Sequence, residues 1–379
     1  MNARGESETD PDVAAQPAPE APVPPAQESS SPPPRRRGLS RRGWTLVCSF
    51  VLLVVFGLIG GLVQVPYVAL GPGPTFDTLG ADDTGATIVS ISGHQTYPTN
   101  GQLRMVTVSL QDQVTLFDAL GLWMSGRYQL APREEYYTPG ESEQQVDQQN
   151  VEEFQESQSN AEVSAMRYLK YPIEVLAQTV VKGSAADGNI KPGDQLIVVN
   201  GKQINSTEDV TDALADTKPG QNVALTVRTG SQAARNLNIK LGSTSGRSQG
   251  FLGVAPGAEA QIPFKVDIGL PNIGGPSAGL MFALAVVDKL TPGGVNGGMS
   301  VAGTGEIDDL GRVSEIGGIP FKLVAAREAG ATVFLTPADN CAEAKAHAPA
   351  GLRLVKVTTL SSAVQELAAL RTGQPVPGC

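Results

Sequence analysis

Residues 265–287 read KVDIGLPNIGGPSAGLMFALAVV, and this stretch sets the pattern for the last third of the chain. Residues 265–270 have the alternating, partly β-branched pattern of a strand, and Gly274 and Gly275 favour a turn. From Ser277 onward the sequence is apolar almost all round, which predicts a buried helix. We therefore expect a strand, a glycine-rich turn and a helix that begins at Ser277.

Ser277 is the first candidate for chemistry in this stretch. A serine in the first turn of a buried helix lies beside free backbone N–H groups, and these groups and the helix dipole favour negative charge there. An acyl-transfer enzyme needs such an oxyanion site together with a nucleophile. The alternative is that Ser277 is an ordinary N-cap residue, because serine is common at that position. The local sequence leaves both interpretations open.

The N-terminal part of the chain predicts a membrane anchor. Residues 1–34 are rich in proline and nearly devoid of large apolar side chains, which predicts disorder. Five arginines follow between positions 35 and 42, and residues 44–63 then carry no charge, a length sufficient to cross a bilayer. A cleaved signal peptide has a shorter apolar region and a small-x-small site, so we expect an uncleaved anchor. The positive-inside rule places Met1 in the cytoplasm and the chain after about residue 66 outside.

Composition narrows the possible partners and cofactors. The formal net charge of the 379 residues is −10, which argues against nucleic-acid binding because affinity for phosphate backbones rests on Lys and Arg. There are three cysteines and two histidines, and their spacing predicts no metal site; we expect no metal and no cofactor. Cys341 and Cys379 could pair in an oxidising compartment, and the sequence leaves open whether they do.

Residues 66–165 carry secondary-structure signals but no motif. Residues 67–84 are typical of a Gly/Pro-rich exit from the membrane, and residues 86–110 predict a β-hairpin or a pair of strands. Residues 115–125 predict a short amphipathic helix, and residues 142–170 a Glu- and Gln-rich helix with a solvated face. These residues either support the C-terminal domain or flank the module that follows them.

Residues 171–242 combine strand patterns, a KPGD turn at 191–194, the strand QLIVVNG at 195–201 and a capped helix from Ser206. In this order they resemble a PDZ domain. The resemblance implies a groove between residues 173–180 and the helix from Ser206, where a peptide adds as a strand. The groove residues that it implies are Ile173, Val175, Leu176, Val210 and Leu214.

The kind of peptide stays open at this point. Residues 168–171, the loop before the expected groove strand, lack the glycine signature of PDZ domains that bind a terminal carboxylate. Binding to C-termini, binding to internal segments and a purely structural PDZ domain that orients its neighbour all remain possible interpretations.

Three motifs lie past residue 250: PSAG at 276–279, TGEI at 304–307, and GRV followed by IGG and a lysine at 311–322. Together they resemble the proteolytic domain of Lon-type serine peptidases. The resemblance implies that Ser277 is the nucleophile, Lys322 its general base and Thr304 the residue that orients the lysine, with Gly275 and Pro276 in support. Because Lon proteolytic domains form rings, it also implies a homo-oligomer.

The proposed base has a physical requirement. Lysine accepts a proton only when neutral, and its reference pKa is about 10.4. Burial disfavours the ammonium and lowers the pKa. Lys322 lies between the apolar residues 319–321 and 323–326, so we expect it to be buried rather than an ordinary exposed lysine.

A rival chemistry also fits residues 275–279. The sequence GPSAG matches the G-x-S-x-G nucleophile elbow of α/β hydrolases, and Asp339 and His347 follow in the order that this scheme needs. No HGGG-type stretch precedes the serine, which disfavours this alternative.

The whole chain is similar in organisation to bacterial membrane-anchored PDZ–Lon-like peptidases. We expect a multidomain α/β (α+β) fold with a disordered cytoplasmic tail (1–43), a transmembrane helix (44–65), membrane-proximal strands and helices (66–165), a β-rich PDZ domain (166–243) and a Lon-like proteolytic domain (250–370).

The expected function follows from this organisation. No G-x-x-x-x-G-K-[ST] loop is present, so we expect cleavage without ATP. The substrates expected are peptides or unfolded protein segments outside the membrane, recruited or gated by the PDZ domain. The alternative is a non-catalytic scaffold that binds an envelope partner through the PDZ groove.

Overall fold

The computed structural model describes residues 40–138, 140–270 and 273–379. The expected disorder of residues 1–34 lies outside these residues. The chain divides into two compact units at Phe56 and Gly57. Helix α1 (Arg41–Leu62) runs across this division, and among the described residues it is the one helix long and apolar enough to span a membrane. It begins three residues before the expected span and ends before residue 65.

A six-stranded sheet forms the centre of the proteolytic half, in the order β16-β15-β12-β3-β1-β4. Strands β3, β12, β15 and β16 are mutually parallel, whereas β1 is antiparallel to both β3 and β4. The bounds are β1 Tyr67–Asp77, β3 Gln102–Gln111, β4 Gln129–Pro132, β12 Ser300–Gly303, β15 Val333–Pro337 and β16 Arg353–Val357.

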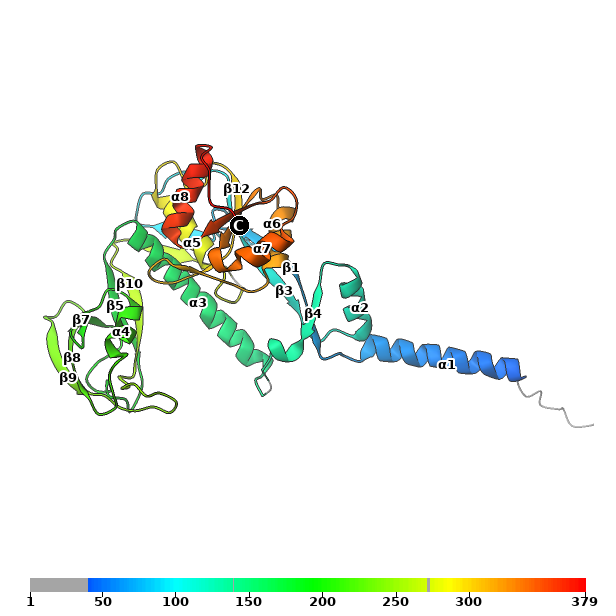
Figure 1. Cartoon of the computed structure of the whole chain (residues 1–379), viewed down its shortest axis with the longest axis horizontal. Helices are drawn as coiled ribbons and strands as arrows, with labels where there is room; N and C mark the ends of the chain where they lie inside the picture. Colours follow the sequence, from blue (N-terminus) through cyan, green and yellow to red (C-terminus); the bar gives the residue numbers. More distant parts are fainter. Residues whose placement is uncertain (1–39, 139, 271–272) are drawn as a thin grey trace, which may run out of the picture. The chain divides into compact units, whose positions relative to one another are not determined.

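Helices cover both faces of this sheet (Figure 1). Successive residues of a strand point to opposite faces. Accordingly Val301 packs in the core with α5 (Gly279–Leu290), whereas Ala302 packs with α6 (Ile319–Glu328). Helices α3 (Glu143–Tyr168) and α8 (Leu360–Arg371) share the α5 core, and α7 (Cys341–His347) shares the α6 core. The result is the expected α/β layering.

The prediction for the membrane-proximal strands needs two corrections. Residues 67–77 are not a simple exit from the membrane, because they form β1 inside the large sheet, with a register shift between Pro72 and Thr75. Of the two alternatives for residues 86–110, the hairpin is wrong and the pair of strands is correct. Strand β2 (Val89–Ser92) pairs with β11 (Lys265–Ile268), while β3 joins the large sheet. Strand propensity indicates that a segment fits a half-buried pleated sheet, but it does not specify which other strand pairs with that segment.

The PDZ module has its own sheet and its own core. Its strand order is β10-β5-β6-β8-β9, with β7 paired to β6. The bounds are β5 Ile173–Val180, β6 Asp194–Val199, β7 Lys202–Gln203, β8 Asn222–Thr229, β9 Arg235–Lys240 and β10 Val254–Ala260. The capped helix expected from Ser206 is α4 (Thr207–Leu214). Strand β10 belongs to this sheet, although the proteolytic domain was expected to start at residue 250.

Short elements complete the fold. The helix expected near residue 115 is α2 (Leu116–Met124), and 3₁₀ turns occupy Arg133–Glu135 and Ala338–Asn340. Strands β13 (Glu306–Ile307) and β14 (Val313–Ser314) pair with each other. Cys341 and Cys379 form a disulfide, which answers the question that the sequence left open.

Candidate active site

Ser277 lies in the turn before α5 rather than in its first helical turn. The helix begins at Gly279, with Ala278 as its N-cap, so the predicted start at Ser277 is two residues too early. The cause is the partner of the Ser277 carbonyl: this oxygen accepts hydrogen bonds from Gly305 N (2.9 Å) and Thr304 Oγ1 (3.0 Å). Within residues 40–138, 140–270 and 273–379, the backbone N–H groups of Ser277 and Ala278 donate no hydrogen bond.

Helix α3 supports the loop that carries Ser277. Gly275 N donates to Asn150 O (2.8 Å), and Ser157 Oγ donates to Pro276 O (2.9 Å). Gly275 has a φ of +84°, which favours glycine. The family resemblance implies supporting roles for Gly275 and Pro276, but nothing in the sequence points to α3. No motif marks Asn150 or Ser157, because their importance comes from a packing contact between distant parts of the chain.

Lys322 is buried on α6. Its helix starts after Gly318, which has a φ of +71°, and Lys322 N donates to the Gly318 carbonyl. The side chain is 3% exposed, and its Nζ donates to Thr304 Oγ1 at 3.1 Å. Burial lowers the pKa of Lys322 to about 7. The amine is therefore neutral in a large fraction of molecules near pH 7.

Ser277 and Lys322 line the same cavity of ≈ 630 Å³. Gly275 and Pro276 form part of its wall, and strands β1 and β3 contribute Leu70 and Met105. Thr304, which is 1% exposed, connects the two candidate residues, because it accepts from the amine of one and donates to the carbonyl of the other. Two consecutive hydrogen bonds thus separate Lys322 Nζ from the main chain of Ser277.

The nucleophile-elbow alternative gains no support from this geometry. His347 is exposed at the end of α7, with Nδ1 3.0 Å from the Glu343 carbonyl oxygen. Neither His347 nor Asp339 is among the residues that line the cavity of Ser277. Among the described residues, no group of three His, Cys, Asp or Glu side chains is placed to hold a metal ion.

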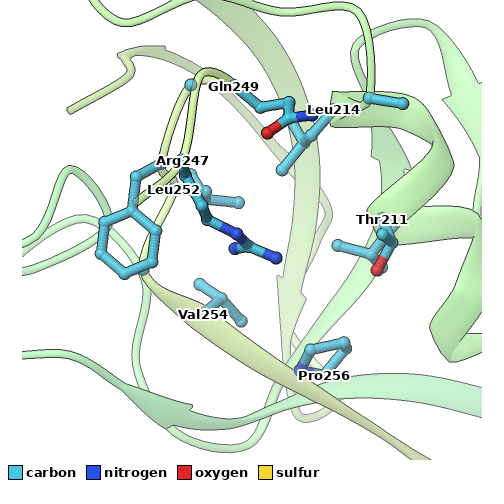
Figure 2. Close-up of a pocket in the computed structure, with 12 residues that line it drawn as sticks. Thr211, Leu214, Arg247, Gln249, Leu252, Val254 and Pro256 are labelled. Carbon is cyan, nitrogen blue, oxygen red and sulfur yellow. The ribbon is translucent and has the colours of Figure 1, made fainter. Parts of the chain in front are cut away.

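The groove beside α4 in the PDZ module, where a peptide was expected, is bordered by β10 rather than by β5 (Figure 2). Strand β5 is covered on one side by β10 and on the other by β6. Of the residues predicted for the groove, Val210 and Leu214 line this ≈ 220 Å³ pocket. Ile173, Val175 and Leu176 do not line it, and Val175 is buried in the PDZ core.

The physical reason is strand order. The strand beside α4 comes from residues 254–260, after the rest of the module, and no local pattern reveals that. The loop that precedes the groove strand is therefore Phe251-Leu252-Gly253, in which Gly253 has a φ of +83°. Figure 2 shows the guanidinium of Arg247 directed into the groove, on the side of Val254 that faces Thr211.

Asp309 joins the PDZ module to the proteolytic domain. Its carboxylate accepts from Thr207 N (3.1 Å) and Thr207 Oγ1 (3.3 Å) at the start of α4. Arg167, in the last turn of α3, donates to Asp309 O (2.8 Å) and to Asn205 O (2.9 Å). Helix α4, which borders the groove beside β10, is thus bonded to the turn just after the TGEI motif.

Comparison with known proteins supports both domain assignments. Residues 259–369 match the family described as the Lon protease (S16) C-terminal proteolytic domain, and residues 146–241 match the PDZ domain family. The Lon protease of Heliobacterium modesticaldum is 34% identical over 154 residues, 39% of this chain and 19% of that protein. That of Clostridioides difficile is 49% identical over 65 residues, 17% of this chain and 8% of that protein.

A third relative and a solved structure also match. Lon protease 1 of Thermus thermophilus is 46% identical over 71 residues, 19% of this chain and 9% of that protein. This chain therefore covers no more than about a fifth of the length of these three relatives. Among solved structures, the PDZ domain of an SdrC-like protein from Listeria monocytogenes matches with 18% identity and a TM-score of 0.21, over 22% of this chain and 86% of that one.

Proposed function

We propose that this chain, which carries a Lon-type proteolytic domain and a PDZ domain, is a membrane-anchored serine endopeptidase that works without ATP. The observation that carries the proposal is the buried Lys322 amine, linked through Thr304 to the main chain of Ser277 in one cavity. An amine with a pKa of about 7 suits general-base catalysis near neutral pH, because a general base is most efficient when its pKa lies close to the operating pH.

The proposed reaction is acyl transfer in two steps. Lys322 takes the proton of Ser277 Oγ as this oxygen bonds to the scissile carbonyl carbon, and then gives that proton to the leaving amine. Water hydrolyses the acyl-enzyme with Lys322 again as base. The N–H groups of Ser277 and Ala278, which donate no hydrogen bond within the described residues, supply an oxyanion site. Thr304 holds the amine until substrate aligns it with Ser277, since catalytic hydrogen bonds often tighten only in the complex.

The PDZ domain has the proposed role of recruiting or gating substrate. Strand β10 ends the described sheet, and its free edge faces the groove beside α4, where an extended peptide can add as a strand. Arg247 offers a cation for a peptide carboxylate at the loop end of this groove. The proposed substrates are peptides or unfolded protein segments.

The proposed location of both domains is the extracytoplasmic side. Helix α1 supplies the single span, and the arginines before it favour a cytoplasmic N-terminus. The Cys341–Cys379 disulfide supports an oxidising compartment for the proteolytic domain. A homo-oligomer, a lack of nucleic-acid partners and independence from ATP belong to the same proposal.

A serine-reactive probe and a peptide substrate test the dyad in the full-length protein. We expect Ser277→Ala to lose both labelling and cleavage, and Lys322→Ala to lose cleavage, with unchanged circular dichroism. His347→Ala is the matched control and should keep wild-type activity. Turnover that persists in Lys322→Ala contradicts the dyad. A wild-type protein that binds peptides but neither reacts with the probe nor cleaves supports the scaffold alternative.

A further inference from the structure

Helix α2 exposes five large apolar side chains on one face. Leu116, Phe117, Leu120, Trp123 and Met124 are between 47% and 72% exposed. At 3.6 residues per turn these positions fall within roughly a third of the helix circumference. Its other side packs on protein, because Ala119 is buried in a small cluster with Ala69 and Val114. An apolar patch of this kind on an otherwise packed helix marks a contact surface.

The same helix is attached to the outer end of the apolar span. Phe117 covers Gly60 in the last turn of α1, where a Cβ atom on the glycine would lie 2.4 Å from the ring. Val65 N donates to Val114 O at 3.0 Å, and Gln64 forms a bridge with Thr115, the N-cap of α2. Because Gly60 lies inside the uncharged stretch 44–63, these contacts hold α2 at the level where that stretch leaves the hydrocarbon.

We infer that α2 lies in the outer leaflet of the membrane, with the Leu116–Met124 face inserted among the upper acyl chains. The inference rests on the proposed membrane anchoring. Because the apolar face of α2 adjoins the end of the membrane span, lipid is the partner that covers it. Tryptophan, here Trp123, is enriched at the membrane–water interface. The one charged side chain of α2, Asp118, is held in a capping box with Thr115.

The lipid contact should depend on apolar insertion. Helix α2 contains no Lys or Arg, so attraction to anionic headgroups contributes little. Its protein side packs on β1 and β4, the edge of the large sheet. Together with α1, α2 gives the proteolytic domain a second point of attachment to the bilayer.

Tryptophan quenching by brominated lipid tests the inference directly. The chain has two tryptophans, so Trp44→Phe leaves Trp123 as the sole reporter in the full-length protein. The protein is reconstituted in phosphatidylcholine vesicles with bromines near the top of the acyl chains. We expect Trp123 to lose most of its emission and to show a blue-shifted maximum.

Two reference variants separate this inference from the anchoring itself. In the background without Trp44 and Trp123, Leu62→Trp reports the end of the span and Val181→Trp reports an exposed position of the PDZ module. Quenching of Trp123 comparable to Leu62→Trp supports the inference. Quenching of Leu62→Trp alone, with Trp123 behaving as Val181→Trp, overturns the α2 inference and leaves the anchor intact. No quenching at any position overturns both.

A second reporter guards against a misfolded tryptophan variant. Met124→Cys in a Cys48→Ser background provides one free thiol for an environment-sensitive dye, since Cys341 and Cys379 are paired. Lipid insertion should give an apolar emission spectrum that does not change with the protein-to-lipid ratio. An emission that becomes water-like on dilution into excess lipid indicates a second copy of the chain on this face and overturns the inference.

Discussion

At the residue scale, burial of the Lys322 amine lowers the stability of the folded chain. Burial lowers its pKa from 10.5 to about 7, so the unfolded chain binds more protons than the folded chain between those values. The buried amine therefore lowers the free energy of unfolding by its full amount below pH 7. This loss disappears as the pH rises from 7 towards 10.5. The shift corresponds to a penalty on the order of a few kcal/mol.

This penalty predicts that Lys322→Met is more stable than the wild type at pH 6, by a few kcal/mol, and that the difference shrinks towards pH 10. Urea denaturation at pH 6, 8 and 10 followed by circular dichroism measures it. Lys356→Met, at an exposed position of β16, is the control and should change little. Parallel pH profiles of wild type and Lys322→Met would show that the amine is not buried as described.

Thr304 offers a second test at this scale, because we propose that it positions the Lys322 amine. Thr304→Val removes the acceptor of the Lys322 amine and the donor to the Ser277 carbonyl. We expect kcat/KM to fall by about tenfold or more, and the midpoint of its pH profile to move to lower pH, because the ammonium loses its hydrogen bond. Thr304→Ser should restore both. A loss of activity with an unmoved midpoint would assign Thr304 a structural role alone.

At the element scale, the disulfide ties the C-terminal segment to α7. Cys341 and Cys379 are 38 residues apart, Lys356 N bonds to Pro377 O (2.9 Å), and Val376 packs against the main core. The segment after α8 is thus held at its end and along its length. A cross-link of this loop length stabilises a protein by about 2–4 kcal/mol in the chain-entropy description.

We therefore expect Cys379→Ser to lower the thermal midpoint by several degrees, to the same value that reduction produces in the wild type. Differential scanning calorimetry with and without a reductant measures this. Reduction should not lower the midpoint of Cys379→Ser further, and Cys48→Ser should match the wild type in both conditions. If reductant leaves the thermal midpoint of the wild type unchanged, the pairing of Cys341 with Cys379 is contradicted.

At the scale of the whole molecule, Asp309 links the turn after the TGEI motif to helix α4 of the PDZ module. Its carboxylate accepts hydrogen bonds from Thr207 N and Thr207 Oγ1 at the start of α4, which borders the groove, while its backbone belongs to the turn after TGEI. A hydrogen bond to a charged group of this kind contributes about 1.5–3 kcal/mol. Its loss should loosen the PDZ module without touching the cavity of Ser277.

The expected result for Asp309→Ala is a split between substrates. Cleavage of a long peptide that engages the groove should slow, whereas a short peptide that reaches only the cavity should be cleaved at the wild-type rate. Glu208→Ala is the matched control, because its pair with Arg312 is about half exposed and contributes little. Equal slowing of both peptides would mean that Asp309 supports the active site itself.

Local sequence patterns predict several helices and the candidate site residues of this protein. The apolar runs predict α1 and α5, the Ser-Thr-Glu-Asp cap predicts α4, and the PSAG, TGEI and IGG motifs predict Ser277, Thr304 and Lys322 as candidates. Such features lie within one turn or one helix, so neighbouring residues suffice to specify them. The match to the Lon-type and PDZ families confirms the fold class that they imply.

Contacts between distant parts of the chain determine the features that local patterns do not predict. The pairing of β2 with β11, the place of β10 at the PDZ edge and the support of the Ser277 loop by Asn150 and Ser157 join residues far apart in the chain. Hydrophobic periodicity indicates that one face of an element is buried, but it does not indicate which other element packs against that face. The start of α5 two residues later than predicted has the same origin, since the Ser277 carbonyl accepts hydrogen bonds from Thr304 and Gly305 instead of from its own helix.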